Sequence, residues 1–244
     1  MTLSSRTLRM VSAAAILLPS FAGAQTLQYV APLSGTTGGL GAVLTVLTLN
    51  NTSNVSSGCV TPMGAGTLAT CGYANNTVQA SSQVRFLSAL GGSLSTLGTD
   101  LRIIANFTEP ANAAETGATV DALSLYLYGP TGVPLYTASL TADVLFPSTN
   151  PGIGNIGFAF GLTPAGAMAF QGFLTTALAG GGTASTLSLG LGASLLDVQG
   201  GLDTFSLTRL NVGTATVVPE PSSYVMMMAG LAGIAVLARR RRHA

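Results

Sequence analysis

The stretch Leu123-Ser-Leu-Tyr-Leu-Tyr-Gly-Pro-Thr-Gly-Val-Pro-Leu-Tyr136 decides the fold class of this chain. From residue 123 to 128, Leu alternates with Ser or Tyr, and a period of two predicts a β-strand with one buried face. The turn Gly129-Pro-Thr-Gly132 follows, where Pro fixes φ and Gly accepts a positive φ. We therefore predict a hairpin between strands 125–128 and 133–140.

Similar runs rich in Thr, Val, Tyr and Phe recur throughout residues 25–217, separated by Gly, Pro, Asn and Ser. They lie at residues 40–49, 101–107, 135–146, 156–160, 186–191 and 204–210. Strands do not alternate with helices along the chain, which argues against a parallel sheet. We therefore predict a mainly β fold: an antiparallel β-sandwich or jelly-roll-like domain.

One segment, residues 163–178, departs from this pattern. Thr163 is a favourable N-cap residue, Pro164 suits the first helical position, and Gly180-Gly-Gly182 marks the end. Two internal glycines weaken a helix by about 1 kcal/mol each relative to Ala. We predict one short helix across an edge of the sheet.

Charge is scarce in this chain: 7% of its residues are charged, whereas soluble proteins average about 25%. All nine basic residues are Arg, and Arg85, Arg102 and Arg209 are the ones that fall between residues 25 and 238. This interior also holds all eight acidic residues, so it is acidic between two basic ends. Such a composition excludes a nucleic-acid partner, which would require a basic surface.

The first 24 residues have the parts of a secretory signal peptide. Arg6 and Arg9 precede a short apolar run at residues 10–18, and Ala22 and Ala24 supply the small residues that precede cleavage before Gln25. The alternative is a membrane anchor, but nine residues span about 14 Å as a helix against a bilayer core of roughly 30 Å. We predict export, with signal peptidase and the export machinery as partners.

The C-terminal end contains three consecutive features. Pro219, Glu220 and Pro221 come first, followed by the uncharged stretch 222–238, which is about 25 Å long as a helix and at the short end of what crosses a bilayer. The basic cluster consists of Arg239, Arg240, Arg241 and Arg242. Such a cluster holds its end of a transmembrane helix in the cytoplasm. We predict a single-pass membrane segment with the domain on the outer side.

This order of features resembles the PEP-CTERM sorting signal of Gram-negative bacteria. The resemblance covers about 26 residues and implies a chain divided into a signal peptide (1–24), an exported domain (25–217) and a sorting signal (218–244). It also implies a membrane-bound intermediate, processing near Pro-Glu-Pro by an exosortase, and a place at the cell surface among exopolysaccharide and biofilm proteins. The alternative is an ordinary C-terminal anchor with a chance Pro-Glu-Pro.

Cys59 and Cys71 are the two cysteines of the chain. An even count in an exported protein predicts a disulfide. The intervening segment contains Pro62, Gly64 and Gly66, so we expect a loop there. The alternative is a pair of free thiols.

Catalytic motifs are absent from the sequence. The single histidine, His243, lies in the sorting signal, so the domain has none for a Ser-His-Asp triad or a zinc site. Carboxylates remain, because glycoside hydrolysis requires two at a suitable separation. The acids of the domain are Asp100, Glu109, Glu115, Asp121, Asp143, Asp197 and Asp203. They form no recognisable motif and no calcium loop, so we predict no cofactor, with Ca²⁺ as the alternative.

We therefore expect a non-enzymatic surface or extracellular-matrix protein. A carbohydrate-binding module is the second hypothesis, with Tyr126, Tyr128 and Tyr136 as exposed contact residues and exopolysaccharide as the ligand. A carboxylate-dependent glycosidase is the third. The absence of Trp, which often lines sugar subsites, argues against the last of these.

Overall fold

The computed structural model describes residues 26–34, 43–51, 54–66, 71–72, 77–108, 117–146, 156–198 and 201–210. The predicted signal peptide and sorting signal lie outside these ranges. Within the described ranges, no helix has the length and hydropathy needed to span a membrane.

Twelve strands in the described part of the chain join in one sheet. They are β1 (Thr26–Ser34), β2 (Leu44–Asn51), β3 (Val55–Thr61), β4 (Gly64–Gly66), β5 (Arg85–Phe86), β6 (Leu101–Asn106), β7 (Ala118–Tyr128), β8 (Pro134–Leu140), β9 (Val144–Phe146), β10 (Ile156–Leu162), β11 (Ser188–Leu196) and β12 (Gly201–Arg209). Hydrogen-bonded neighbours follow the order β2-β12-β6-β10-β1-β8-β7-β11-β3-β4, with β5 on β11 and β9 on β7. The prediction of a mainly β domain is confirmed.

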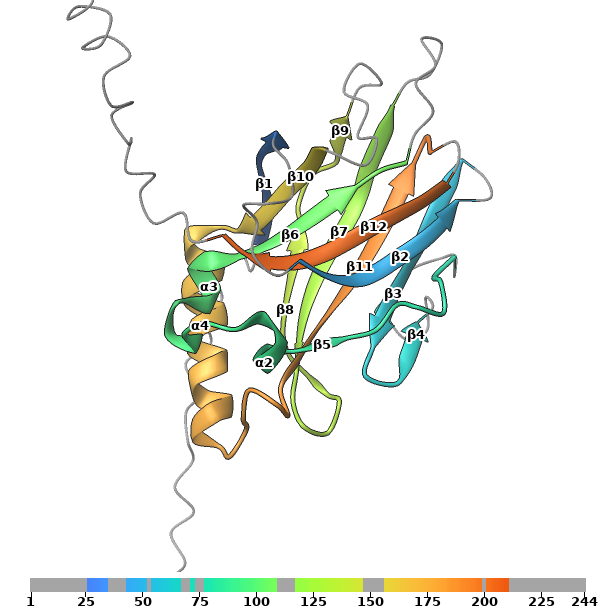
Figure 1. Cartoon of the computed structure of the whole chain (residues 1–244). Helices are drawn as coiled ribbons and strands as arrows, with labels where there is room; N and C mark the ends of the chain where they lie inside the picture. Colours follow the sequence, from blue (N-terminus) through green and yellow to red (C-terminus); the bar gives the residue numbers. More distant parts are fainter. Residues whose placement is uncertain are drawn as a thin grey trace, which may run out of the picture.

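The sheet nearly closes on itself. The β2 and β3 strands are far apart in the sheet order, yet the segment that begins at Thr77 lies between them and bonds to both. The amide of Thr77 donates to the carbonyl of Ser57 (3.1 Å), and the Thr77 carbonyl accepts from the amide of Asn50 (2.8 Å). Figure 1 shows β6, β12 and β2 passing in front of β7, β11 and β3. Two faces therefore enclose the core, as in the predicted sandwich, but they belong to one continuous sheet.

Pairing in the sheet is antiparallel except between β1 and β8. These two strands run parallel and share two residue pairs, Thr26 with Ser139 and Leu27 with Leu140. Parallel pairing was not predicted from the sequence, because the two strands are distant along the chain.

The predicted hairpin is confirmed by β7 and β8. The Gly129 amide donates to the Val133 carbonyl (2.9 Å), and the Gly132 amide donates to the Gly129 carbonyl (3.0 Å). Gly132 has φ +79°, a conformation that side chains with a Cβ rarely adopt. The turn residues thus fix the hairpin as expected from their conformational preferences.

The predicted strand 135–146 is interrupted once. The β8 and β9 strands both pair with β7, through Ser124 with Ser139 and through Val120 with Val144. The register differs by one residue between these pairs, so residues 141–143 form a bulge-like break. The alternation of apolar residues predicts the strand, but it does not reveal this shift.

Aromatic and leucine side chains fill the space between the two faces. The aromatic cluster consists of Phe107, Phe146, Phe158, Phe160 and Phe205. The ring centroids of Phe146 and Phe158 lie 4.1 Å apart. The leucines of β7 and β11 complete the core, with Leu125, Leu127, Leu189 and Leu191 all buried.

The helices within the described residues are α2 (Leu87–Leu90), the 3₁₀ turn η2 (Leu94–Thr96), α3 (Leu97–Asp100) and α4 (Pro164–Ala179). The predicted helix is α4, and its Thr163 cap is confirmed, since the hydroxyl oxygen accepts from the amide of Gly166 (3.1 Å). Figure 1 shows α4 along one flank of the sheet beside α3. The three short elements before β6 were not predicted, because one-turn helices have no periodicity to detect.

Candidate functional site

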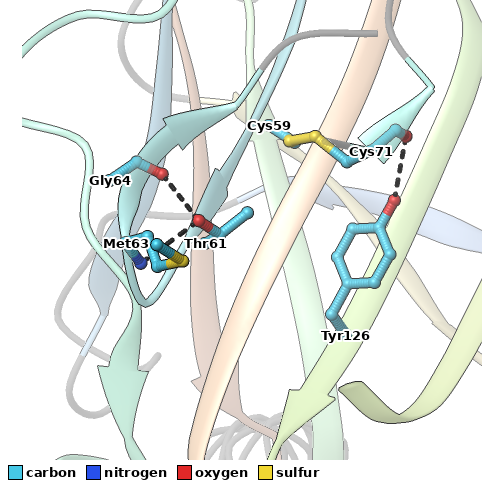
Figure 2. The surroundings of a disulfide bond; sticks show 6 residues. All are labelled: Cys59, Thr61, Met63, Gly64, Cys71 and Tyr126. Atoms are coloured by element: carbon cyan, nitrogen blue, oxygen red, sulfur yellow. Dashed lines mark hydrogen bonds between the residues drawn. A yellow bond between two sulfur atoms is a disulfide. The ribbon is translucent and has the colours of Figure 1, made fainter. Parts of the chain in front are cut away.

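The two cysteines form the predicted disulfide, Cys59–Cys71, with their Cα atoms 6.5 Å apart (Figure 2). Cys59 is fully buried on β3, where it pairs with Gly192 of β11 and with Gly66 of β4. The hydroxyl of Tyr126 donates to the Cys71 carbonyl at 3.5 Å. The disulfide therefore fastens the chain beyond β4 to a buried strand of the sheet.

The segment between the cysteines was expected to be a loop, and this prediction is wrong for its first part. Residues 59–66 form a hairpin of β3 and β4. The hydroxyl of Thr61 stabilises its turn by donating to the Gly64 carbonyl (3.1 Å) and accepting from the Met63 amide (3.2 Å), as Figure 2 shows. A tight turn with Pro and Gly joins strands as readily as it marks a loop.

Among the predicted acids, Asp100 is committed to an ion pair with Arg209 (Nη2 to Oδ2, 3.0 Å). Burial of Asp100 opposes its ionisation. Hydrogen bonds from Thr96 and Arg209 outweigh this effect, with a further contribution from Thr99, and lower the pKa of the carboxyl. The sequence gives little signal for this pair, because its members are more than a hundred residues apart.

Arg209 also fastens the turn that precedes α3. Its guanidinium donates to the carbonyls of Gly91 (2.5 Å) and Ser93 (2.7 Å) and to the hydroxyl of Thr96 (2.9 Å). A guanidinium presents several donors in a fixed plane, so a single Arg can satisfy several acceptors at once. Asp100 and Arg209 thus serve to hold the end of β12 in place.

The remaining described acids lie on β12 and around β7. Asp203 is buried on β12 and accepts from the amide of Thr108 (3.0 Å). Asp197 is exposed at φ +61°, 3.5 Å from the Thr119 hydroxyl. Asp121 and Asp143 are exposed neighbours, since they flank the paired residues of β7 and β9.

Glu109 and Glu115 lie outside the described residues. Within those residues, no three His, Cys, Asp or Glu side chains gather as a metal-binding group.

The three tyrosines proposed as sugar contacts are not an exposed row. Tyr128 and Tyr136 are buried, at 4% and 2% of full exposure, and Tyr126 is half-buried against Tyr128. Burial raises the pKa of Tyr136 to about 12, and its hydroxyl donates to the Gly166 carbonyl (2.9 Å). Burial, with a smaller effect of Tyr126, also raises the pKa of Tyr128. The prediction that these three side chains are exposed contact residues is therefore wrong.

The predicted processing residues Pro219, Glu220, Pro221 and Arg239 to Arg242 lie outside the described residues, as do Ala22, Ala24 and Gln25. No curated protein and no solved structure matches the chain. A family model does match its C-terminal end, over residues 217–242, which include both the Pro-Glu-Pro sequence and the Arg cluster. These residues carry the PEP-CTERM protein-sorting motif, the signal indicated by their order in the sequence.

Proposed function

We infer that this is an exported protein of the Gram-negative cell envelope, processed by an exosortase at its C-terminal end. The sorting motif at residues 217–242 is the observation that carries the proposal. In the proposed pathway the N-terminal signal is removed before Gln25, and residues 222–238 hold a single-pass intermediate in the inner membrane. Cleavage near Pro-Glu-Pro then releases the domain to the cell surface or the extracellular matrix.

The disulfide supports an exported domain. Disulfides persist in oxidising compartments outside the cytoplasm and are rare within it. The Cys59–Cys71 bond closes a loop whose ends are 12 positions apart, and loops of this size are stabilised by about 3 kcal/mol in the chain-entropy model. The domain thus depends on the chemistry of the compartment to which its signals would send it.

We further propose that the domain acts without catalysis, as a structural component beside exopolysaccharide in a biofilm. The placement of the described acids supports this view. Asp100 is held by Arg209 and Asp203 is buried, whereas Asp121, Asp143 and Asp197 are exposed. Asp100, Asp197 and Asp203 each accept a hydrogen bond within the domain, from Arg209, Thr119 and Thr108 respectively, so these three carboxylates already have partners in the domain.

Processing is tested by expressing the chain in a Gram-negative strain with an exosortase and in the same strain without it. The intact mass and the cellular fraction of the protein are measured in both. We expect the mass to fall by the residues beyond the cleavage point when the enzyme is present, and the Arg cluster to be retained when it is absent. Retention of Arg239 to Arg242 in both strains would overturn the proposal.

A matched pair of variants tests the motif itself. The chain contains two Glu-Pro steps, Glu220-Pro221 in the motif and Glu109-Pro110 in the domain. We expect Glu220→Gln to slow processing and Glu109→Gln to leave it unchanged, because the enzyme reads the motif rather than the dipeptide. Equal processing of both variants would remove Glu220 from the recognition site.

A further inference from the structure

The N-terminal end of the described domain lies against the first turn of α4. The Thr26 carbonyl accepts from the Thr163 amide (3.0 Å), and the hydroxyls of the two residues are also hydrogen-bonded (3.0 Å). A Cβ added to Gly166 would lie 3.0 Å from the Thr26 carbonyl oxygen. The chain therefore enters the domain at the flank formed by α4.

The C-terminal end leaves the domain at the same flank. The Leu210 amide donates to the carbonyl of Asp100, the last residue of α3 (3.0 Å). The α3 helix in turn packs on α4, where the Gln171 side chain accepts from the Gly98 amide (3.3 Å) and donates to the Leu94 carbonyl (3.0 Å). Both chain ends thus meet the layer of helices rather than opposite ends of the domain.

Chain length limits how the domain can turn relative to a membrane. Eleven residues separate Leu210 from Ser222, where the uncharged stretch begins, and fully extended they reach at most about 40 Å. A domain of this size has a radius of gyration of about 16 Å and hence a diameter of about 40 Å. The end of the domain that lies away from α3 and α4 could therefore face the membrane only if all eleven linker residues were fully extended along the domain.

The outer face of α4 is suited to contact with lipid. The helix contains no charged residue, and its exposed positions fall on one side. This outer face consists of the half-buried Gly172 and the exposed residues Pro164, Ala165, Met168, Thr175, Thr176 and Ala179. The Met168 side chain is 71% exposed. The hydroxyls of Thr175 and Thr176 donate within the helix, to Gln171 (2.8 Å) and Gly172 (3.0 Å), so little hydrogen bonding to water is lost on contact with lipid.

The charged side chains of β6 and β12 also distinguish the α3 end of the domain from the opposite end. Arg102 on β6 pairs with Thr208 of β12, so Arg102 and Arg209 both lie at the α3 end of these strands, where Arg209 also meets Asp100. Asp203 lies at the other end of these strands, against Thr108. Anionic lipid headgroups attract basic side chains and repel acidic ones. The two basic side chains therefore lie at the end of the domain that chain length already places near the membrane.

We propose that the outer face of α4 rests on the lipid surface while residues 222–238 anchor the chain. This inference rests on the proposed membrane-bound intermediate. It assigns to that intermediate a defined orientation, with α3 and α4 toward the bilayer and the hairpin of β3 and β4 away from the anchor. The Pro-Glu-Pro sequence is then held close to the membrane, where a membrane protease acts.

The orientation is tested with the full chain reconstituted in vesicles containing anionic lipid and a headgroup-linked quencher. A fluorescent thiol reagent is attached to Met168→Cys or Thr175→Cys on the outer face of α4. Leu145→Cys on β9, whose native side chain is 59% exposed, is the matched control. The native cysteines are joined in the disulfide, so the label reacts with the thiol of the introduced cysteine. Flotation of the vesicles reports membrane anchoring independently of the label.

We expect the protein to float with the vesicles, with loss of fluorescence at positions 168 and 175 and none at 145. Flotation with no quenching at 168 and 175, or with equal quenching at all three positions, would overturn the orientation and leave the membrane anchor intact. Excimer emission from pyrene-labelled Met168→Cys would overturn it as well, because a second copy would then cover the face. Failure to float would overturn both the orientation and the proposed intermediate.

Discussion

The side chains of Arg209 and Asp100 meet at 3.0 Å and join the end of β12 to the end of α3. Next to them the Leu210 amide donates to the Asp100 carbonyl, so the main chain and a side chain fix the same point. Residues beyond this point lead to the sorting motif. The ion pair thus lies at the last strand that the structure describes before the sorting motif.

Replacing Arg209 with Ala should destabilise the domain. The variant removes four donated hydrogen bonds, two of them to backbone carbonyls of the turn before α3. We expect a loss of roughly 2 kcal/mol in the free energy of unfolding, measured with urea. Arg209→Lys retains the charge without the planar fork and should lose less. Equal stability of the Ala variant and the wild type would show that the pair contributes nothing.

Asp100 should make stability depend on acid pH. Its pKa is lowered in the folded state, so the folded protein holds the proton less tightly than the unfolded chain. The resulting stabilisation is present above the unfolded pKa of about 3.9 and is lost as the pH falls through the folded value. Below pH 4 we therefore expect unfolding free energy to fall more steeply in the wild type than in Asp100→Asn. Parallel pH profiles would contradict this prediction.

Loss of the disulfide should weaken the domain without abolishing its fold. Cys59→Ala with Cys71→Ala opens the bridged loop, with an expected loss of about 3 kcal/mol. Urea unfolding of the double variant and of the wild type with and without reductant measures this loss. Reduction should destabilise the wild type and leave the variant unchanged. If reductant left the unfolding free energy of the wild type unchanged, the disulfide would not stabilise the domain.

Tyr136 should make stability depend on alkaline pH. Burial raises the pKa of Tyr136 to about 12 in the folded protein, whereas a tyrosine hydroxyl in the unfolded chain ionises near pH 10. The contribution of Tyr136 to the free energy of unfolding is fully present below pH 10. It declines as the pH rises through the pKa of the folded state. Between pH 10 and 12 the wild type should lose more stability than Tyr136→Phe. At neutral pH the free energy of unfolding of the Phe variant should be lower by about 1 kcal/mol, because the hydrogen bond to the Gly166 carbonyl is lost.

Local sequence signals predicted the hairpin and α4 because their causes are local. Gly132 takes a positive φ within the turn, and Thr163 caps the helix that begins with Pro164. The strands β1, β3, β4 and β5 were missed. Gly and Ser interrupt the apolar alternation of β3, and β5 consists of two residues that pair with β11. Pairing with distant strands, rather than intrinsic preference, creates these elements.

The chain ends and the tyrosines show the same division between local and distant causes. The order of Pro219, Glu220 and Pro221, an uncharged stretch and an Arg cluster is a local pattern, and the sorting motif was predicted from it. The burial of Tyr136 depends on α4, which begins 28 positions later in the chain, and no spacing in the sequence indicates that contact. Alternation identifies which side chains share a face, but not which faces are covered.

Two glycines of the helical flank should respond oppositely to Ala. A Cβ at Gly98 would lie 2.5 Å from the Ala167 carbonyl oxygen, so Gly98→Ala must push α3 away from α4, with an expected loss of about 1–3 kcal/mol. A Cβ at Gly172 meets nothing within 4 Å, and Ala favours a helix interior by up to about 1 kcal/mol, so Gly172→Ala should stabilise. Urea unfolding of both variants measures the two effects. Because Gly98 lies in the contact that joins the C-terminal exit to α4, a stability unchanged by Gly98→Ala would mean that α3 does not fix that exit.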